Sequence, residues 1–230
     1  MKFFKNKRKE PLTDTQLLMT ITICIFVAMY LLAMLLLQGG FLHAQQIFDL
    51  LNDNASLIIV SCGLTIVMIG GGIDISVGAV TSLVTMSSIL YLNGGGNVFM
   101  SILLSLGIGL AFGLVHGFLI SYLEIQPFIV TLAGMFFARG MTTILSVNPQ
   151  KIDNEAFNAV RESKIEIPWL GYVAKNGNLV PARMELGVVI ALVCVVLVFV
   201  LLKFLKPGRN LYAMGGNQTS ALMLGINVKR

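Results

Sequence analysis

The sequence has few charged residues, and one long stretch has none. Asp, Glu, Lys and Arg make up 12% of the 230 residues, hydrophobic residues make up 56%, and the mean hydropathy is +0.85. No Asp, Glu, Lys or Arg lies between Ile75 and Leu123. This composition lies outside the soluble globular range, and the length leaves room for several spans of about 20 residues. We therefore expect most of the chain to lie in a bilayer.

The sequence also lacks the usual signs of catalysis and metal binding. Cys24, Cys62 and Cys194 fall in apolar segments without C-x-x-C spacing, which favours buried thiols over metal ligands or a disulfide. His43 and His116 have no second histidine or carboxylate at the spacing of a zinc-binding helix. The phosphate-binding pattern G-x-x-x-x-G-K-[ST] is absent. We expect no catalytic residue, no metal site and no cofactor, with any ATP hydrolysed on a separate chain.

The formal net charge of +5 is divided between the two ends of the chain. Basic residues cluster near the N-terminus (Lys2, Lys5, Lys7, Arg8, Lys9) and near the C-terminus (Lys203, Lys206, Arg209, Lys229, Arg230). Basic segments favour the cytoplasmic side of a membrane, so we expect both ends to be cytoplasmic and no nucleic-acid partner. Residues 17–37 lack a small-residue cleavage site, which predicts a retained first span and not a signal peptide.

Apolar residues form five blocks, at 15–37, 55–92, 98–123, 127–146 and 185–206. The second block is too long for one simple span and contains three consecutive glycines. If both ends are cytoplasmic, the number of crossings is even, so this block crosses twice or enters and leaves as two half-helices. Both alternatives predict a broken helix at residues 70–74. The expected fold class is all-α, a polytopic integral membrane helical bundle with a broken second span.

The connecting segments give a less consistent signal. Segments 38–52 and 93–97 contain no Lys or Arg, as expected outside the cell, whereas 147–184 contains five, which opposes an external position. The two basic ends outweigh this one loop. We expect a single transmembrane domain over 1–230, with a cytoplasmic tail at 1–14, an external loop at 147–184 and a cytoplasmic segment at 207–230.

Small residues and proline mark further boundaries. The run 93–97, Asn-Gly-Gly-Gly-Asn, is typical of a turn between two helices. Gly109, Gly113 and Gly117 recur every fourth residue, which predicts close packing of another helix, either in this chain or in a dimer. Pro127 predicts a helix start. The stretch 147–184 is expected to be exposed, with a short helix near 155–164; Trp169 and Tyr172 fit either interfacial anchoring or docking of an external partner.

Two ionisable residues lie deep in apolar segments. Asp74 or Ser76 fits either a cap on the helix that follows the glycines or a contact with a transported molecule, together with the backbone of Gly71 and Gly72. Arg139 lies about 18 Å from Pro127 along a helix, which is too far from the inner edge for easy snorkelling. We hypothesise that Arg139 pairs with Asp74. The alternative is that the span ends near Gly140 and that Arg139 reaches the outer interface.

Three segments together resemble the permeases of bacterial sugar ABC importers. They are 71–78 (GGIDISVG), 127–140 (PFIVTLAGMFFARG) and 208–217 followed by 225–227 (GRNLYAMGGN and GIN). The similarity is closest to the ribose, xylose and galactofuranose branch, especially galactofuranose-type permeases. The resemblance implies a bacterial inner membrane protein that pairs with a second permease chain. It also implies a periplasmic sugar-binding protein and cytoplasmic ATPase subunits as partners.

The last motif resembles the segment that couples such permeases to their ATPase. The residues carried over are Gly215, Gly216, Asn217, Ala221, Leu222 and Gly225. Residues 218–224 combine helix formers with an apolar cluster, which suits a short helix inserted into a groove of another protein. A plain cytoplasmic turn of helix is the alternative.

The sequence stops at Arg230, where later spans of such permeases would follow, so we expect the N-terminal part of a permease. Two other functions stay open. One is an ion-coupled secondary transporter in which Asp74 titrates; the other is a membrane fragment without independent transport. The sequence does not specify the sugar, which the resemblance limits to a monosaccharide such as galactofuranose or a ribose-like sugar.

Overall fold

The computed structural model describes residues 13–36, 44–173 and 179–228. The basic residues 2–9, Lys229 and Arg230 lie outside the described residues, as do most of the 1–14 tail and His43. The described helices are α1 (Asp14–Leu36), α2 (Ala44–Ile69), α3 (Val77–Asn93), α4 (Val98–Ser121), α5 (Pro127–Leu145), α6 (Glu155–Glu162), α7 (Leu186–Phe204), α8 (Lys206–Gly216) and α9 (Gln218–Met223). The strands are β1 (Lys164–Val173) and β2 (Leu179–Glu185).

Within these described ranges, five helices are long and apolar enough to cross a membrane, namely α1, α2, α4, α5 and α7. The expected polytopic helical fold is therefore confirmed, and the β1–β2 pair is an addition that the sequence did not reveal. The chain divides into two compact units, one formed by Met1–Leu50 and Ile167–Ala182, the other by Leu51–Glu166 and Arg183–Arg230. In the first unit α1 buries none of its side chains, as suits a helix that faces lipid.

The second apolar block is broken as predicted. Helix α2 ends at Ile69 and α3 begins at Val77, with non-helical backbone between them. Helix α2 is 26 residues and about 39 Å long, so it can cross a bilayer by itself. Helix α3 has 17 residues, or about 26 Å. Helix α2 therefore fits a full crossing and not a half-helix, whereas α3 is shorter than the hydrocarbon core of about 30 Å.

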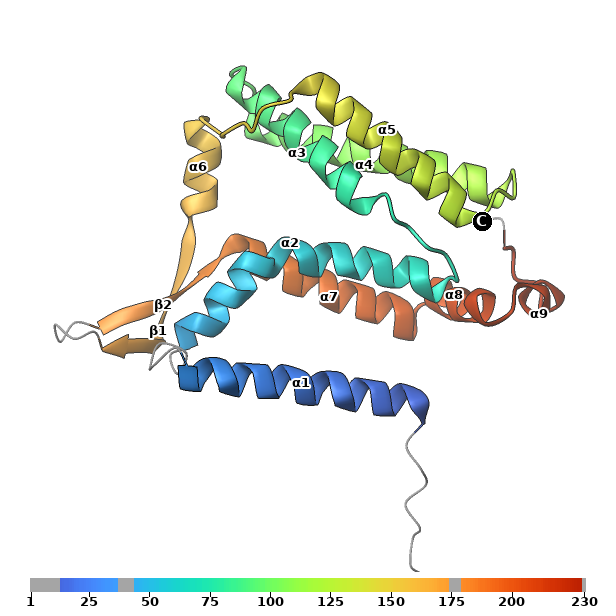
Figure 1. Cartoon of the computed structure of the whole chain (residues 1–230), viewed down its shortest axis with the longest axis horizontal. Coiled ribbons are helices and arrows are strands. Elements are labelled where there is room, and N and C mark those ends of the chain that lie inside the picture. The colour runs from blue at the N-terminus through green and yellow to red at the C-terminus, as the bar shows by residue number, and fades with distance from the viewer. Residues whose placement is uncertain (1–12, 37–43, 174–178, 229–230) are drawn as a thin grey trace, which may run out of the picture. The chain divides into compact units, whose positions relative to one another are not determined.

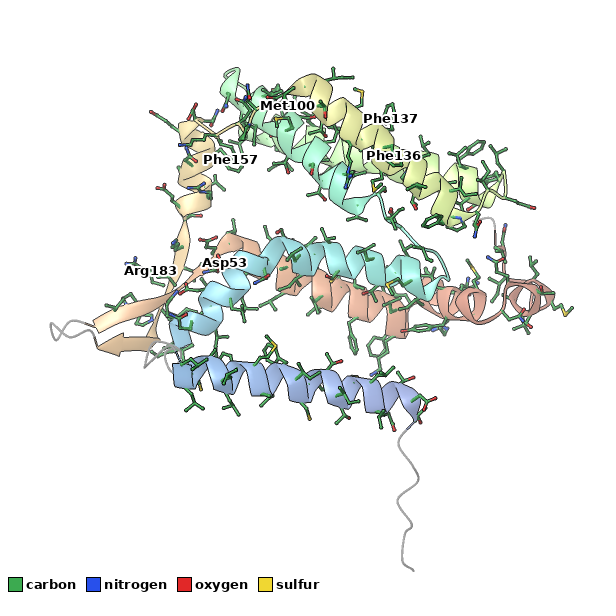
Figure 2. The ribbon with its side chains drawn as sticks, in the orientation of Figure 1. Asp53, Met100, Phe136, Phe137, Phe157 and Arg183 are labelled. Carbon is green, nitrogen blue, oxygen red and sulfur yellow. The ribbon has the colours of Figure 1, made fainter. Side chains whose placement is uncertain are left out.

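Helices α3, α4 and α5 pack together in the second unit (Figure 1). Their core contains Ala79 and Leu83 of α3 and Ala138 of α5. The hydroxyls of Ser88 and Ser105 hydrogen-bond across α3 and α4 at 2.8 Å. Helices α4 and α5 also carry exposed large apolar side chains, among them Phe136 and Phe137 of α5 (Figure 2).

The glycine stripe of α4 does not form this contact. A Cβ added at Gly109, Gly113 or Gly117 would meet nothing within 4 Å in the part of the chain that the structure describes. Helix α4 instead turns Ile108 and Phe112 toward α3 and α5. The prediction of close helix packing on the stripe is therefore wrong for the described helices, because larger apolar side chains on another face of α4 fill the interface.

Helices α2 and α7 form a second packed pair (Figure 1). Ala55 of α2 meets Val188 and Ala191 of α7, and all three side chains are buried. The Asn52 side-chain oxygen accepts a hydrogen bond of 2.9 Å from the Glu185 amide, just before α7 begins. This bond fixes the start of α7 against α2.

The 147–184 stretch contains the expected short helix, α6, and a β-hairpin. At the base of the hairpin Lys164 lies 3.7 Å from Glu185, and Arg183 lies 3.3 Å from Glu166. These side chains are 37–55% exposed, so the pairs contribute little to stability. Trp169 is 86% exposed, which is compatible with both readings of this residue.

Two asparagines tie the α3–α4 turn to the segment before α6. The Asn93 amide group donates to the Lys151 carbonyl at 2.7 Å, and its oxygen accepts from the Asp153 amide at 3.0 Å. Asn154 donates to the carbonyls of Leu92 and Gly96, both at 3.2 Å. The Asn154 oxygen also caps α6 by accepting from the Phe157 amide at 3.0 Å.

Replacing Asn154 with alanine should loosen α6 from the α3–α4 turn. The substitution removes one helix cap, worth about 1 kcal/mol, and two further hydrogen bonds of about 1 kcal/mol each. Hydrogen exchange should accelerate across α6 and residues 92–97. Asn154→Asp keeps the capping oxygen and loses both donated bonds, so its exchange rate should lie between those of the wild type and Asn154→Ala. Unchanged exchange in Asn154→Ala would show that the hydrogen bonds of Asn154 do not stabilise this region.

Candidate functional site

The break between α2 and α3 is built by glycines at the end of α2. The Gly72 amide donates to the Val67 carbonyl and the Gly71 amide to the Met68 carbonyl, both at 3.0 Å. Gly71 has a φ of +81°, the left-handed conformation that glycine adopts at little cost. Together these features form a Schellman helix ending. The glycine run therefore ends α2 and changes the direction of the chain.

Asp74 begins the next helix. Its Oδ1 accepts hydrogen bonds from the Ser76 amide at 2.8 Å and from the Ser76 hydroxyl at 2.6 Å. Ser76 is 2% exposed and is the N-cap residue of α3, but its side chain caps no amide of the helix. Of the two residues expected to cap, Asp74 is the one that accepts an amide hydrogen. Its carboxylate satisfies both donors of a buried residue.

The break also contacts α5. The buried Thr131 hydroxyl lies 3.4 Å from the Ile73 carbonyl oxygen and 3.4 Å from the Phe128 carbonyl oxygen. Both distances are long for an O–H···O hydrogen bond, so they indicate proximity more than strength. The start of α3 therefore lies beside the first turns of α5.

The hypothesis that Asp74 pairs with Arg139 is wrong. Within the described part of the chain these two residues form no ion pair, and Arg139 is exposed on α5. The physical reason is distance, because the break meets α5 at Thr131, eight residues or about 12 Å along the helix before Arg139. The alternative was that the span ends near Gly140. This helix boundary is also wrong, because α5 continues to Leu145.

Helix α8 lies directly against the end of α2 (Figure 1). A Cβ added at Gly215 would overlap the carbonyl oxygen of Ile69 and would come within 3.3 Å of the Gly71 nitrogen. A Cβ at Gly71 would lie 3.6 Å from the Gly215 Cα. The two backbones thus touch without any intervening side chain. Only glycine at position 215 permits this approach.

The short helix predicted within residues 218–224 is present as α9, which follows α8. The Asn217 side chain caps it by accepting from the Ser220 amide at 2.9 Å. It ends in a second Schellman arrangement: Gly225 has a φ of +77°, its amide donates to Leu222, and the Ile226 amide donates to Ala221. Ala221 is 1% exposed.

The outer surface of this segment is apolar. Leu222, Met223 and Leu224 are 57%, 83% and 76% exposed. We call these three residues the α9 knob. Single exposed apolar residues are common, but three consecutive exposed apolar residues at a helix end suit a partner groove. Gly216 is close to no other group, since a Cβ there would meet nothing within 4 Å among the described residues.

The structure therefore brings together two sets of residues that the sequence kept apart. Gly71 of the expected pathway lies beside Gly215 of the expected coupling segment, whereas Arg139 lies elsewhere on α5. The sequence missed α8 itself, although Pro207 near its start is a usable signal. Across the described ranges no group of three or more metal-binding side chains gathers.

Comparison with known proteins assigns the chain to a family. Residues 46–230 match the family described as branched-chain amino acid transport system / permease component. The fructose import permease protein FruG of Bifidobacterium longum (strain NCC 2705) is 36% identical over 222 residues, which are 94% of this chain and 62% of that protein. No solved structure was found to match.

Two proteins of Escherichia coli (strain K12) are also similar. The inner membrane ABC transporter permease protein YjfF is 34% identical over 91% of this chain and 60% of its own length. The galactofuranose transporter permease protein YtfT is 30% identical over 84% of this chain and 52% of its own length. The chain thus spans between half and two thirds of the length of these relatives.

Proposed function

The chain belongs to the family of branched-chain amino acid transport system / permease components, and we propose that it is a membrane-spanning permease subunit of a binding-protein-dependent ABC importer for a monosaccharide. Its relatives carry names of fructose and galactofuranose permeases, which supports a sugar as the substrate class. Its partners would be a cytoplasmic ATPase, a periplasmic sugar-binding protein, a second permease chain and the lipid bilayer.

One observation carries this proposal: the backbone contact between Gly215 and the end of α2. The coupling segment of an importer has to pass movement of the ATPase to the membrane helices. Here the segment touches the point at which α2 stops and α3 begins. A shift of α8 therefore pushes directly on the α2–α3 break, because no flexible side chain lies between the backbones to absorb it.

The α9 knob is the proposed contact with the ATPase. Its three apolar side chains are exposed, while Ala221 anchors α9 from the other side. Closure of the ATPase pair on nucleotide would move the knob, then α8, then the break, and would open the permease toward the opposite side. Any ATP is bound by the partner, and this chain supplies no catalytic group.

The proposed sugar pathway involves the break and α5. Asp74 and Ser76 fix the start of α3, and Gly71 and Gly72 leave its approach free of side chains. Arg139 is the second proposed pathway residue; it is exposed on α5, next to Ala138, which packs with α3. Five donors in a fixed fork suit the hydroxyls of a sugar.

Reconstituted uptake tests the proposal. The chain would be expressed with its permease partner, ATPase and binding protein, purified, and placed in liposomes. Uptake of labelled sugar should require ATP and the binding protein, and should survive an uncoupler at fixed ATP. Uptake that an uncoupler abolishes would point to an ion-coupled transporter. Failure of the ATPase and binding protein to co-purify would point to an inert membrane fragment.

The same proposal fixes the membrane sidedness: N-terminus cytoplasmic, 147–184 external, 207–230 cytoplasmic. In a variant whose three cysteines are replaced by serine, Ser163→Cys and Thr219→Cys place a thiol at two exposed positions. An impermeant maleimide should label position 163 from the periplasm and position 219 only in inside-out vesicles. The reverse pattern would refute this orientation.

A further inference from the structure

A cavity of about 480 Å³ lies where three separate segments of the second unit meet. One wall is the glycine run Gly70, Gly71 and Gly72. A second wall is the α4–α5 turn, and a third comes from α8, α9 and the residues after them. The volume lies within the usual range for small-molecule sites, about 300–1,000 Å³.

The lining of this cavity suits a neutral molecule with several hydroxyl groups. Its polar side chains are one carboxylate, Glu124, two carboxamides, Gln126 and Gln218, and one hydroxyl, Ser121. Carboxylates and carboxamides pair with vicinal hydroxyls because they present adjacent acceptors, or an acceptor beside a donor. Apolar lining residues such as Ile125 and Leu222 offer surfaces for C–H groups.

A second large cavity of the unit, between α4 and α5, has a different chemistry. It has a volume of about 560 Å³, and apart from His116 its lining side chains are apolar. Of these two cavities, the one beside the coupling segment is the one with several polar side chains. A free anion would meet the Glu124 carboxylate, and a hard cation would find a single carboxylate where it needs several oxygen ligands.

Glu124 adopts a conformation that costs energy. Its φ is +55°, and in the described ranges every other residue with a positive φ is a glycine. A left-handed non-glycine residue costs on the order of 1 kcal/mol and persists where its surroundings hold it. Glu124 is therefore both the strained residue of the α4–α5 turn and the residue whose carboxylate lines the cavity.

We infer that this cavity is a binding site for the transported sugar on its way to the cytoplasm, with Glu124, Gln126 and Gln218 as its hydrogen-bonding residues. The inference rests on the proposed function, since it takes the substrate class from there. Because Gln218 and Leu222 belong to α9, the coupling segment forms part of the site. Its movement therefore changes the shape of the site and releases the sugar at a defined step.

Thiol protection tests the site directly. The full complex, with Cys24, Cys62 and Cys194 replaced by serine and Met214→Cys introduced at a lining position outside the three hydrogen-bonding residues, is labelled with an impermeant maleimide in inside-out vesicles. D-Fructose, D-ribose and D-galactose are the probes, each added separately. At about ten times its dissociation constant, the recognised sugar should slow labelling about tenfold, because protection follows 1 + [L]/Kd. Adding Glu124→Gln should raise the dissociation constant about tenfold, so that the same sugar concentration slows labelling only about twofold.

The control thiol is Thr219→Cys, on an exposed residue of α9 that does not line the cavity. Sugar should not change its labelling rate. If none of the three sugars slows labelling at position 214, the inference is overturned. Slowing by the ATPase alone, without any effect of sugar, would overturn it too and assign the cavity to the partner. ATP-driven uptake in the same preparation reports on the proposed function separately.

Discussion

Replacing Gly215 with alanine should lower ATP-driven uptake at least about tenfold while the chain still inserts and binds its partners. A methyl group at this position overlaps the Ile69 carbonyl oxygen, so α8 has to move away from the end of α2. Overpacking of this kind costs about 1–3 kcal/mol, and 1.4 kcal/mol corresponds to a factor of ten. ATP hydrolysis should continue but lose its dependence on the binding protein, because the movement no longer reaches the break.

Gly63→Ala is the matched control for this variant. Gly63 lies inside α2, and a Cβ there would meet nothing within 4 Å in the described part of the chain. Alanine also favours a helix over glycine by up to about 1 kcal/mol. Gly63→Ala should therefore keep wild-type uptake. Normal uptake in Gly215→Ala would mean that the backbone contact is not part of the coupling route.

Asp74→Ala should destabilise the start of α3 more than Asp74→Asn. The Asp74 carboxylate is the acceptor for both the amide and the hydroxyl of Ser76, which is 2% exposed. Each buried donor left without a partner costs about 1–3 kcal/mol. Asparagine keeps an acceptor oxygen in the same place, so most of this energy is retained. Thermal unfolding of the purified protein should show a clear drop for alanine and a small one for asparagine.

The same pair of variants separates two mechanisms. In an ATP-driven permease where Asp74 holds the start of α3, Asp74→Asn should keep most of the uptake. In an ion-coupled transporter the carboxylate has to titrate, so Asp74→Asn would fold and yet abolish uptake. Asp53→Ala serves as a control for removing a carboxylate, since Asp53 is exposed on α2 (Figure 2).

The features that the sequence predicted correctly are those that depend on local composition, namely the membrane spans and the helix break. Long apolar runs gave the spans, and the three glycines with an even number of crossings gave the break. The beginning of α2 was placed eleven residues too late, at 55 instead of Ala44, because polar residues such as Gln45 and Asp49 hide its first turns from a hydropathy pattern. A hydrogen bond from Gln45 to Asp49 shows that these turns stabilise themselves with polar side chains.

Other features depend on contacts between distant segments, which one sequence does not display. The hydrogen bonds of Asn93 and Asn154 join residues about 60 positions apart, and the Gly215 contact joins residues more than 140 positions apart. The Asp74–Arg139 pairing failed for the same reason. Charge complementarity suggested the pair, but the register between α3 and α5 decides which residues meet, and it places Thr131 beside the break.

The most direct measurement is the distance between α2 and α8 during transport. Spin labels at Met68 and Tyr212, both exposed, sit on the two helices that meet at Gly215. If α8 and the end of α2 move as one body, pulsed electron resonance should give one narrow distance distribution, unchanged between nucleotide-free and nucleotide-trapped complexes. A distribution that broadens or shifts between these states would show that the two helices separate, and it would contradict coupling through their backbone contact.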